Sequence, residues 1–176
     1  VCAQGHTALA LTIEPRKDYP ALVAAFDAVA AVRPGLRLVI AGPDGWGMET
    51  FTSAVARATH RDRIVRLGYV DEPARAALLR GAAALVYPSV YEGFGLPPLE
   101  AMAAGTPVVA GASGAVREVC GDAAELVAVG DTDALAAGIE RVLADSAHRD
   151  SLVARGAARA ARFSWSEHVA GIVAMY

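Results

Sequence analysis

The chain has 176 residues, a length that favours one domain, and 16 Lys and Arg against 19 Asp and Glu give it a formal net charge of −3. That balance excludes the strongly basic surface by which proteins bind nucleic acid or an anionic membrane. The longest stretch without a charge, Ala101–Val116, is 16 residues long and is broken by three glycines and a proline, so it cannot span a bilayer.

Six short runs rich in Val, Leu and Ile are predicted to form strands. Apolar residues are continuous in these runs rather than alternating with polar ones, which is typical of parallel strands covered on both faces. The runs are Thr7–Thr12, Leu36–Ala41, Ile64–Leu67, Ala83–Tyr87, Val108–Ala110 and Glu125–Ala128. Amphipathic stretches alternate with them, and this alternation predicts an α/β fold with a Rossmann-like, doubly wound parallel sheet.

The predicted helices lie between the strands and after the last one. The first carries Leu22, Phe26 and Val29 on one face and stops at Pro34-Gly35. The others are Met48–Thr59, Glu72–Gly81, Pro98–Ala104, Thr132–Leu143 and Asp150–Arg162. Together they predict one domain over residues 1–163.

A further helix is predicted over residues 164–176. Ser164 and Glu167 form a capping box at its start. Its apolar face is formed by Trp165, Val169, Ile172 and Tyr176. Because an apolar helix that follows a complete sheet needs a surface to cover, we expect that surface to lie outside this chain. The sequence also begins at Val1, with no initiator Met and no signal-peptide pattern, so we expect a piece of a longer protein.

Ligands of such sheets bind beyond the carboxyl ends of the strands, which makes the loops there the candidate site. These loops are Glu14–Asp18, Gly42–Gly47, Gly68–Glu72, Pro88–Pro98 and Gly111–Glu118.

No motif for a metal or a dinucleotide stands out in the chain. Asp131-Thr132-Asp133 has the D-x-D spacing of some metal sites, but it directly precedes an amphipathic helix, so we interpret Asp131 as a helix cap. The four histidines have no ligand spacing, and Cys2 and Cys120 provide neither a metal motif nor a disulfide framework. Thr50 stands at the third glycine position of a G-x-G-x-x-G motif begun by Gly45, so no dinucleotide fingerprint is present.

The segment Glu14-Pro15-Arg16-Lys17 places two adjacent cations just after the first strand, at a helix N-terminus that already favours an anion. Lys17 is the only lysine beside 15 arginines, which indicates a position that prefers a compact ammonium. From these residues alone, an anion site and a solvated surface pair remain equally open.

The most informative segment is Pro88–Glu100, with sequence PSVYEGFGLPPLE. Glu92 and Glu100 are separated by seven residues, among them two glycines that let backbone N–H groups approach a ligand closely. Pro97-Pro98 is suited to a helix entry, which places Glu92 in the loop and Glu100 in the first helical turn. Carboxylates accept hydrogen bonds from vicinal hydroxyls, so one acid suits a sugar and the other a ribose.

On these residues the chain resembles the C-terminal, donor-binding domain of the group 1 glycosyltransferases, which are retaining enzymes of the two-domain GT-B type. The resemblance covers nearly the whole chain. It is carried mainly by the E-x7-E segment, with support from the EPRK and GYV motifs.

The resemblance implies a role for each matching residue. Arg16 and Lys17 would neutralise the donor diphosphate, Glu92 would be catalytic at the donor sugar, and Glu100 would bind the nucleotide ribose. The remaining donor contacts would come from main chain: Phe94, Gly95 and Leu96 at the sugar and phosphate, and Val70 with Tyr69 at the base.

Three features depart from the family pattern. Leu11-Thr12 stands where many relatives have Gly-Thr, and Arg117-Glu118 stands where they have Pro-Glu, which leaves the role of Glu118 open. The N-terminal acceptor domain is absent, and the predicted helix over residues 164–176 would pack on it.

The implied function is transfer of a sugar from a nucleotide-diphosphate sugar to an acceptor hydroxyl with retention, with this chain as the donor-binding half, inactive alone. We expect no cofactor and no metal, since Arg16, Lys17 and helix N-termini would stabilise the leaving group. The expected partners are the donor, an unknown acceptor and the missing domain. We expect a cytoplasmic location, with any peripheral membrane contact made through that domain.

Two alternatives remain. One is a sugar-nucleotide 2-epimerase of the same architecture, which would be expected to carry His and acid groups in place of the E-x7-E loop. The other is a non-catalytic nucleotide-binding module.

Overall fold

The computed structural model describes residues 7–163, with side chains from residue 13 onward. The helix predicted over residues 164–176 lies outside the described residues. Six parallel strands form one sheet in the order β3-β2-β1-β4-β5-β6. They are β1 Thr7–Ile13, β2 Arg37–Asp44, β3 Ile64–Gly68, β4 Ala84–Tyr87, β5 Val108–Gly111 and β6 Glu125–Val127.

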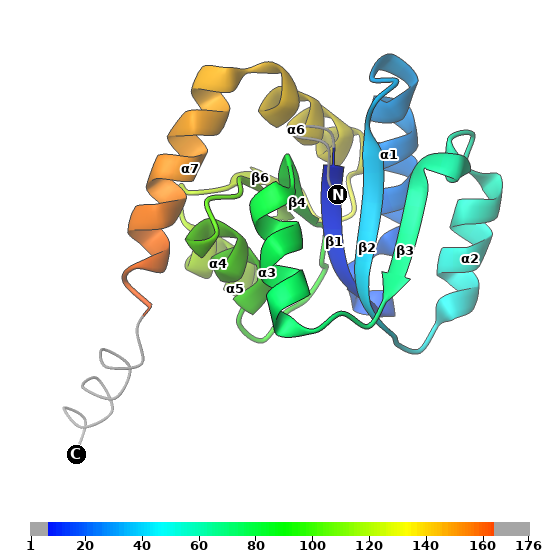
Figure 1. Cartoon of the computed structure of the whole chain (residues 1–176), viewed down its shortest axis with the longest axis horizontal. Helices are drawn as coiled ribbons and strands as arrows, with labels where there is room; N and C mark the ends of the chain where they lie inside the picture. Colours follow the sequence, from blue (N-terminus) through cyan, green and yellow to red (C-terminus); the bar gives the residue numbers. More distant parts are fainter. Residues whose placement is uncertain (1–6, 164–176) are drawn as a thin grey trace.

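Helices cover both faces of this sheet (Figure 1). They are α1 Tyr19–Val32, α2 Met48–Arg57, α3 Glu72–Gly81, α4 Leu96–Ala103, α5 Gly114–Cys120, α6 Thr132–Ala144 and α7 Ser146–Ala160, with short 3-10 turns η1 Pro15–Lys17 and η2 Arg61–Arg63. The predicted Rossmann-like α/β fold is therefore confirmed.

Two hydrophobic clusters, one on each face, hold these layers together. The first joins α1, α2 and α6 through side chains such as Phe26, Phe51 and Ile139. The second joins α3, α4 and α5 through Leu79, Met102 and Val116. Strands buried between two helical layers need apolar residues on both faces, which is why their sequences are continuous apolar runs.

Strand β1 lies in the middle of the sheet and pairs with β2 on one side and β4 on the other. The chain adds β2 and β3 on the first side and then crosses over to add β4, β5 and β6 on the second. The connections that follow β1 and β4 leave their carboxyl ends toward opposite faces of the sheet, and it is where two such ends meet that sheets of this kind bind ligands. The loops that follow the two strands are the ones that carry Arg16, Lys17 and Glu92.

Three predicted boundaries are wrong. A helix, α5, begins at Gly114 inside the segment predicted as a loop, Gly111–Glu118, because Val116, Val119 and Cys120 bury one face of it. Helix α4 begins at Leu96 rather than Pro98, so Glu100 lies in its second turn. Helix α7 begins at Ser146 rather than Asp150, since Asp145 caps it by accepting a hydrogen bond from the backbone N of His148.

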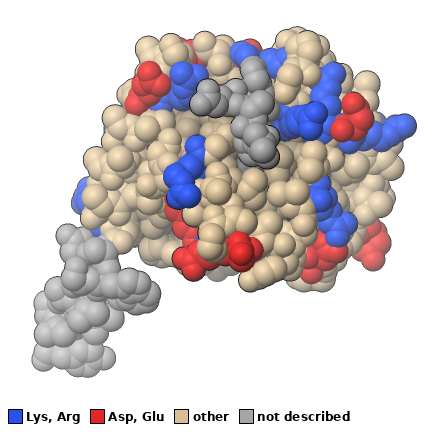
Figure 2. Space-filling view, viewed as in Figure 1, with Lys and Arg blue, Asp and Glu red and all other residues tan. Residues whose placement is uncertain are grey.

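Charges of both signs are interspersed on the face of the molecule shown in Figure 2, and much of that face is uncharged. None of the helices within residues 7–163 is long and apolar enough to cross a membrane.

Candidate active site

The two cations predicted to bind phosphate lie on η1, the single 3-10 turn that links β1 to α1. Asp18 ends this turn in the left-handed conformation, at φ +47°, and its carboxylate accepts from the backbone N of Ala21 to cap α1. The two cations differ in burial. The Lys17 side chain is 8% exposed, whereas that of Arg16 is 41% exposed.

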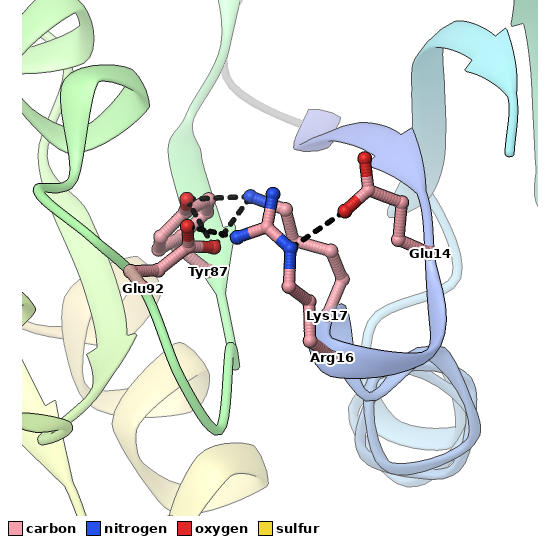
Figure 3. A network of polar contacts seen from close by, with 5 residues as sticks. All are labelled: Glu14, Arg16, Lys17, Tyr87 and Glu92. Atoms are coloured by element: carbon pink, nitrogen blue, oxygen red, sulfur yellow. Dashed lines mark hydrogen bonds and ion pairs between the residues drawn. The ribbon is translucent and has the colours of Figure 1, made fainter.

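Both cations contact Glu92, which follows β4 (Figure 3). Lys17 Nζ donates to Glu92 Oε1 at 2.6 Å, and a guanidinium nitrogen of Arg16 donates to Glu92 Oε2. Arg16 Nε also donates to Glu14 Oε2, at 2.6 Å. The structure therefore brings the predicted residues Arg16 and Lys17 together with Glu92, which lies 75 positions after Lys17 in the sequence.

Tyr87, the last residue of β4, completes the cluster. Its hydroxyl accepts a hydrogen bond from Lys17 Nζ at 2.5 Å and donates one to Glu92 Oε1 at 2.6 Å. Lys17 Nζ also lies 4.2 Å from the centre of the Tyr87 ring. We call Arg16, Lys17, Tyr87 and Glu92 the Glu92 cluster.

Electrostatics keep the Glu92 carboxyl ionised despite its burial. Burial by itself raises the pKa of this group, but the hydrogen bonds from Lys17 and Tyr87 outweigh it and lower the pKa from 4.5 to about 2. The pKa of Tyr87 is raised by burial and by the neighbouring carboxylate, so its hydroxyl stays protonated and remains a donor. The cluster thus holds a buried negative charge at neutral pH.

A main-chain bond fixes the distance between the two loops of the site. The backbone N of Val90 donates to the backbone O of Arg16 at 2.9 Å. Because the loop after β4 is tied directly to η1, the cations and Glu92 are held in place by backbone as well as by side chains.

Glu100 lies in a different environment. It projects from the second turn of α4, and both of its oxygens accept from the same nitrogen of Arg75 on α3, at 2.9 and 2.7 Å. Both side chains are about one-third exposed. Arg75 lines an open pocket of about 300 Å³ together with Tyr69, Val70 and Pro97. The predicted residue Val70 thus lines this pocket, and Glu100 is linked to it through Arg75, away from the Glu92 cluster.

The loop between the two glutamates ends at Gly95, which has a φ of +113° and caps α4. A Cβ at Gly95 would meet only ordinary contacts, so it is the backbone conformation that requires glycine here. The neighbours Phe94 and Leu96 leave about half of their surface exposed. Phe94 packs edge-on against Phe163, with ring centres 6.0 Å apart.

Other candidates have structural explanations. Asp131 accepts from the backbone N of Ala134 at 2.8 Å, which confirms its interpretation as the cap of α6. Glu118 is exposed on α5. Within residues 7–163, no three His, Cys, Asp or Glu side chains gather as metal ligands would.

The sequence analysis missed two residues. Tyr87 has a detectable signal, because it is the last residue of a strand that leads directly into the candidate loop. Arg75 has none, since one arginine on an amphipathic helix cannot be distinguished from a solvated one before the neighbouring helix is placed.

A family model described as "Glycosyl transferases group 1" matches residues 10–159. The chain belongs to this family. It is 39% identical over 163 residues to the O-antigen chain mannosyltransferase B of Escherichia coli, covering 92% of this chain and 43% of that protein.

Solved structures agree with this assignment. Sucrose-phosphate synthase from Thermosynechococcus elongatus superposes with a TM-score of 0.82 and 32% identity, over 96% of this chain and 44% of that one. The C-terminal domain of a group 1 glycosyltransferase from Francisella tularensis has the same fold, with a TM-score of 0.78 and 23% identity, over 89% of this chain and 84% of that one. The chain therefore corresponds to the C-terminal domain of this group and spans less than half the length of the first two proteins.

Proposed function

We propose that the chain is the donor-binding half of a retaining glycosyltransferase that moves a sugar from a nucleotide-diphosphate sugar to an acceptor hydroxyl. The observation that carries this proposal is the Glu92 cluster, which places two cations and an ionised carboxylate beyond the carboxyl ends of the neighbouring strands β1 and β4. A diphosphate leaving group needs cations, and a sugar that loses it becomes positively charged and needs an anion.

We assign each part of the donor to the residues whose charge and shape fit it. The diphosphate oxygens would contact Arg16 and Lys17, and the sugar would lie against Glu92. The nucleoside would enter the pocket beside Tyr69 and Val70, with its ribose hydroxyls donating to Glu100, which Arg75 holds in position. The main chain at Phe94, Gly95 and Leu96 would complete the contacts to sugar and phosphate. In this proposal Arg16, Lys17 and the helix N-termini stabilise the leaving group without a metal.

Transfer further requires an acceptor held next to the donor with water excluded. We propose that a second domain supplies it, so that this chain alone binds nucleotide weakly and transfers no sugar. We also propose a cytoplasmic location, with which the buried free thiol of Cys120 is compatible.

The test is calorimetric titration of the chain with UDP, GDP and ADP and with their sugar conjugates, including mannose conjugates because a relative is named a mannosyltransferase. One nucleotide should bind, and Arg16→Met should weaken that binding about tenfold through loss of a charged hydrogen bond. Arg33→Met is the matched control. Arg33 also pairs with a glutamate, Glu140, but it follows the C-terminal end of α1. It therefore lies just before the amino end of β2, whereas the site lies at the carboxyl ends of the strands.

Binding that is unaffected by Arg16→Met would remove the cluster from the donor site, and absence of binding to every nucleotide would overturn the proposal. The alternatives have their own outcomes in the longer protein. An epimerase would convert a sugar nucleotide without any acceptor, and a binding module would leave it unchanged.

A further inference from the structure

The Tyr87 hydroxyl joins the two buried charges of the cluster. It accepts from the Lys17 ammonium and donates to Glu92 Oε1, which also accepts from Lys17 directly. The three polar groups form a closed triangle, and its two bonds to Glu92 are strengthened when that carboxyl is ionised and Lys17 is protonated. Tyr87 itself is 2% exposed and belongs to the core between the sheet and α4, so its ring cannot turn away easily.

The two oxygens of Glu92 are held in different ways. Oε1 is fixed by Tyr87 and Lys17, both of which are buried. Among the side chains that the structure describes, the donor to Oε2 is Arg16, which is 41% exposed and also contacts Glu14. An arriving anion can therefore draw Arg16 toward solvent, whereas movement of Lys17 would break its hydrogen bonds to two buried groups, Tyr87 and Glu92.

We propose that Tyr87 is a positioning residue of the donor site, which anchors one oxygen of Glu92 and leaves the other free for the sugar when Arg16 turns to the diphosphate. This inference rests on the proposed function. It assigns unequal roles to the two adjacent cations: Lys17 chiefly fixes Glu92, and Arg16 is the cation that exchanges between carboxylate and phosphate. Besides the Tyr87 hydroxyl, the described groups that face Glu92 are the charged side chains of Arg16 and Lys17. Glu14 pairs with Arg16 and so affects Glu92 indirectly.

The first experiment needs no donor. The Glu92 carboxyl is titrated by NMR in the ¹³C-labelled chain, in the parent and in Tyr87→Phe, which keeps the ring and removes the hydroxyl. The titration midpoint of Glu92 should rise by about one unit in the variant, because one donor to the charged form is lost. Tyr19→Phe is the matched control. The Tyr19 hydroxyl is also buried, but it has no hydrogen-bond partner among the described residues, so the midpoint should not move.

A purely structural role for Tyr87 would lower the melting temperature without moving the Glu92 titration, and that result overturns the inference. A second measurement in the parent chain covers the case in which Tyr87→Phe fails to fold. The Tyr87 hydroxyl proton should exchange with solvent far more slowly than that of Tyr91, which is 71% exposed. Equal exchange rates would show that the triangle does not persist in solution.

The last experiment is kinetic and uses the longer protein. Tyr87→Phe should lower kcat about tenfold and change the donor KM less than twofold, since it acts on the orientation of Glu92 in the transition state. A tenfold rise in donor KM at unchanged kcat would mean that Tyr87 serves ground-state binding, contrary to the proposal. The titration is independent of any transfer activity, so a shifted Glu92 midpoint in a chain that binds no nucleotide would contradict the proposed function and leave the anchoring of Glu92 intact.

Discussion

The two glutamates of the E-x7-E segment are equivalent in the sequence and very different in the structure. Glu92 is 8% exposed and contacts two cations and a phenol, and its pKa is lowered to about 2. Glu100 is about one-third exposed and contacts one arginine at the rim of an open pocket. An ion pair in water contributes little, whereas a buried charge depends strongly on its partners. The comparison teaches that burial, rather than residue type, separates a group suited to the chemical step from one suited to binding.

Stability should show the largest difference between the two regions. Lys17→Met removes one partner of a buried pair and should lower the free energy of unfolding by about 3 kcal/mol. The matched change Arg75→Met acts on the exposed pair and should cost less than about 1 kcal/mol. Urea unfolding of the two variants measures both effects. Equal losses would break the comparison.

Turnover should separate the same two regions in the longer protein. Glu92→Gln keeps the shape of the side chain but removes the charge that, under the proposed function, would lie against the donor sugar, so kcat should fall about 100-fold. Glu100→Gln should instead raise the donor KM about tenfold with little change in kcat, because a ribose contact is made equally before and during the reaction. Steady-state kinetics with varied donor gives both values, and the opposite pattern would reverse the two assignments.

Acid should weaken the fold through the Glu92 region. The pKa of Glu92 is about 2 in the folded chain and near 4.5 when unperturbed, so the ionised carboxyl stabilises the fold above pH 4.5. This contribution, about 3 kcal/mol, is lost as the pH falls from 4.5 to 2. The stability of Glu92→Gln should therefore depend less on pH in this window than that of the parent, as measured by urea unfolding at several pH values. Parallel curves for the two proteins would contradict the lowered pKa.

Asp131 is an acidic control for the comparison of Glu92 with Glu100. Of the substitutions at these three acidic residues, those at Asp131 should change stability and binding least. Asp131→Ala removes the cap of α6 and should cost about 1 kcal/mol, whereas Asp131→Asn retains a capping side chain and should be nearly neutral. Neither change should alter nucleotide binding by the chain, with or without EDTA. Nucleotide binding that EDTA abolishes, that Mn²⁺ restores in the parent and that is lost again in Asp131→Ala would instead indicate that this aspartate belongs to a metal site.

The strands of the sheet could be predicted from the sequence, because buried parallel strands require unbroken apolar runs. Such runs can be recognised in a single sequence. The capping role of Asp131 was likewise local and was predicted correctly. Helix α5 was missed because its seven residues follow a Gly-Ala-Ser-Gly segment that has the composition of a turn. This segment is helical because Val116 and Val119 pack against the rest of the core. Such tertiary contacts cannot be recognised from the local sequence.

For the site, the residue types were predictable but their contacts were not. Arg16 and Lys17 were expected to form an anion site, yet in this structure a carboxylate of the same chain lies between them. That arrangement depends on β1 and β4 being neighbours in the sheet, which the local sequence of neither segment encodes. The link between Arg75 and Glu100 likewise requires α3 and α4 to pack side by side.

The main-chain bond from Val90 to Arg16 determines which positions of the site are free to vary. Because no side chain takes part in it, substitutions at Val90 and Tyr91, whose side chains are 42% and 71% exposed, leave the spacing of the charges unchanged. These two positions border the Glu92 cluster without supporting it, so they can be varied while the spacing of its charges is kept. Proline at position 90 is the exception, since it has no N–H to donate and would separate the two loops.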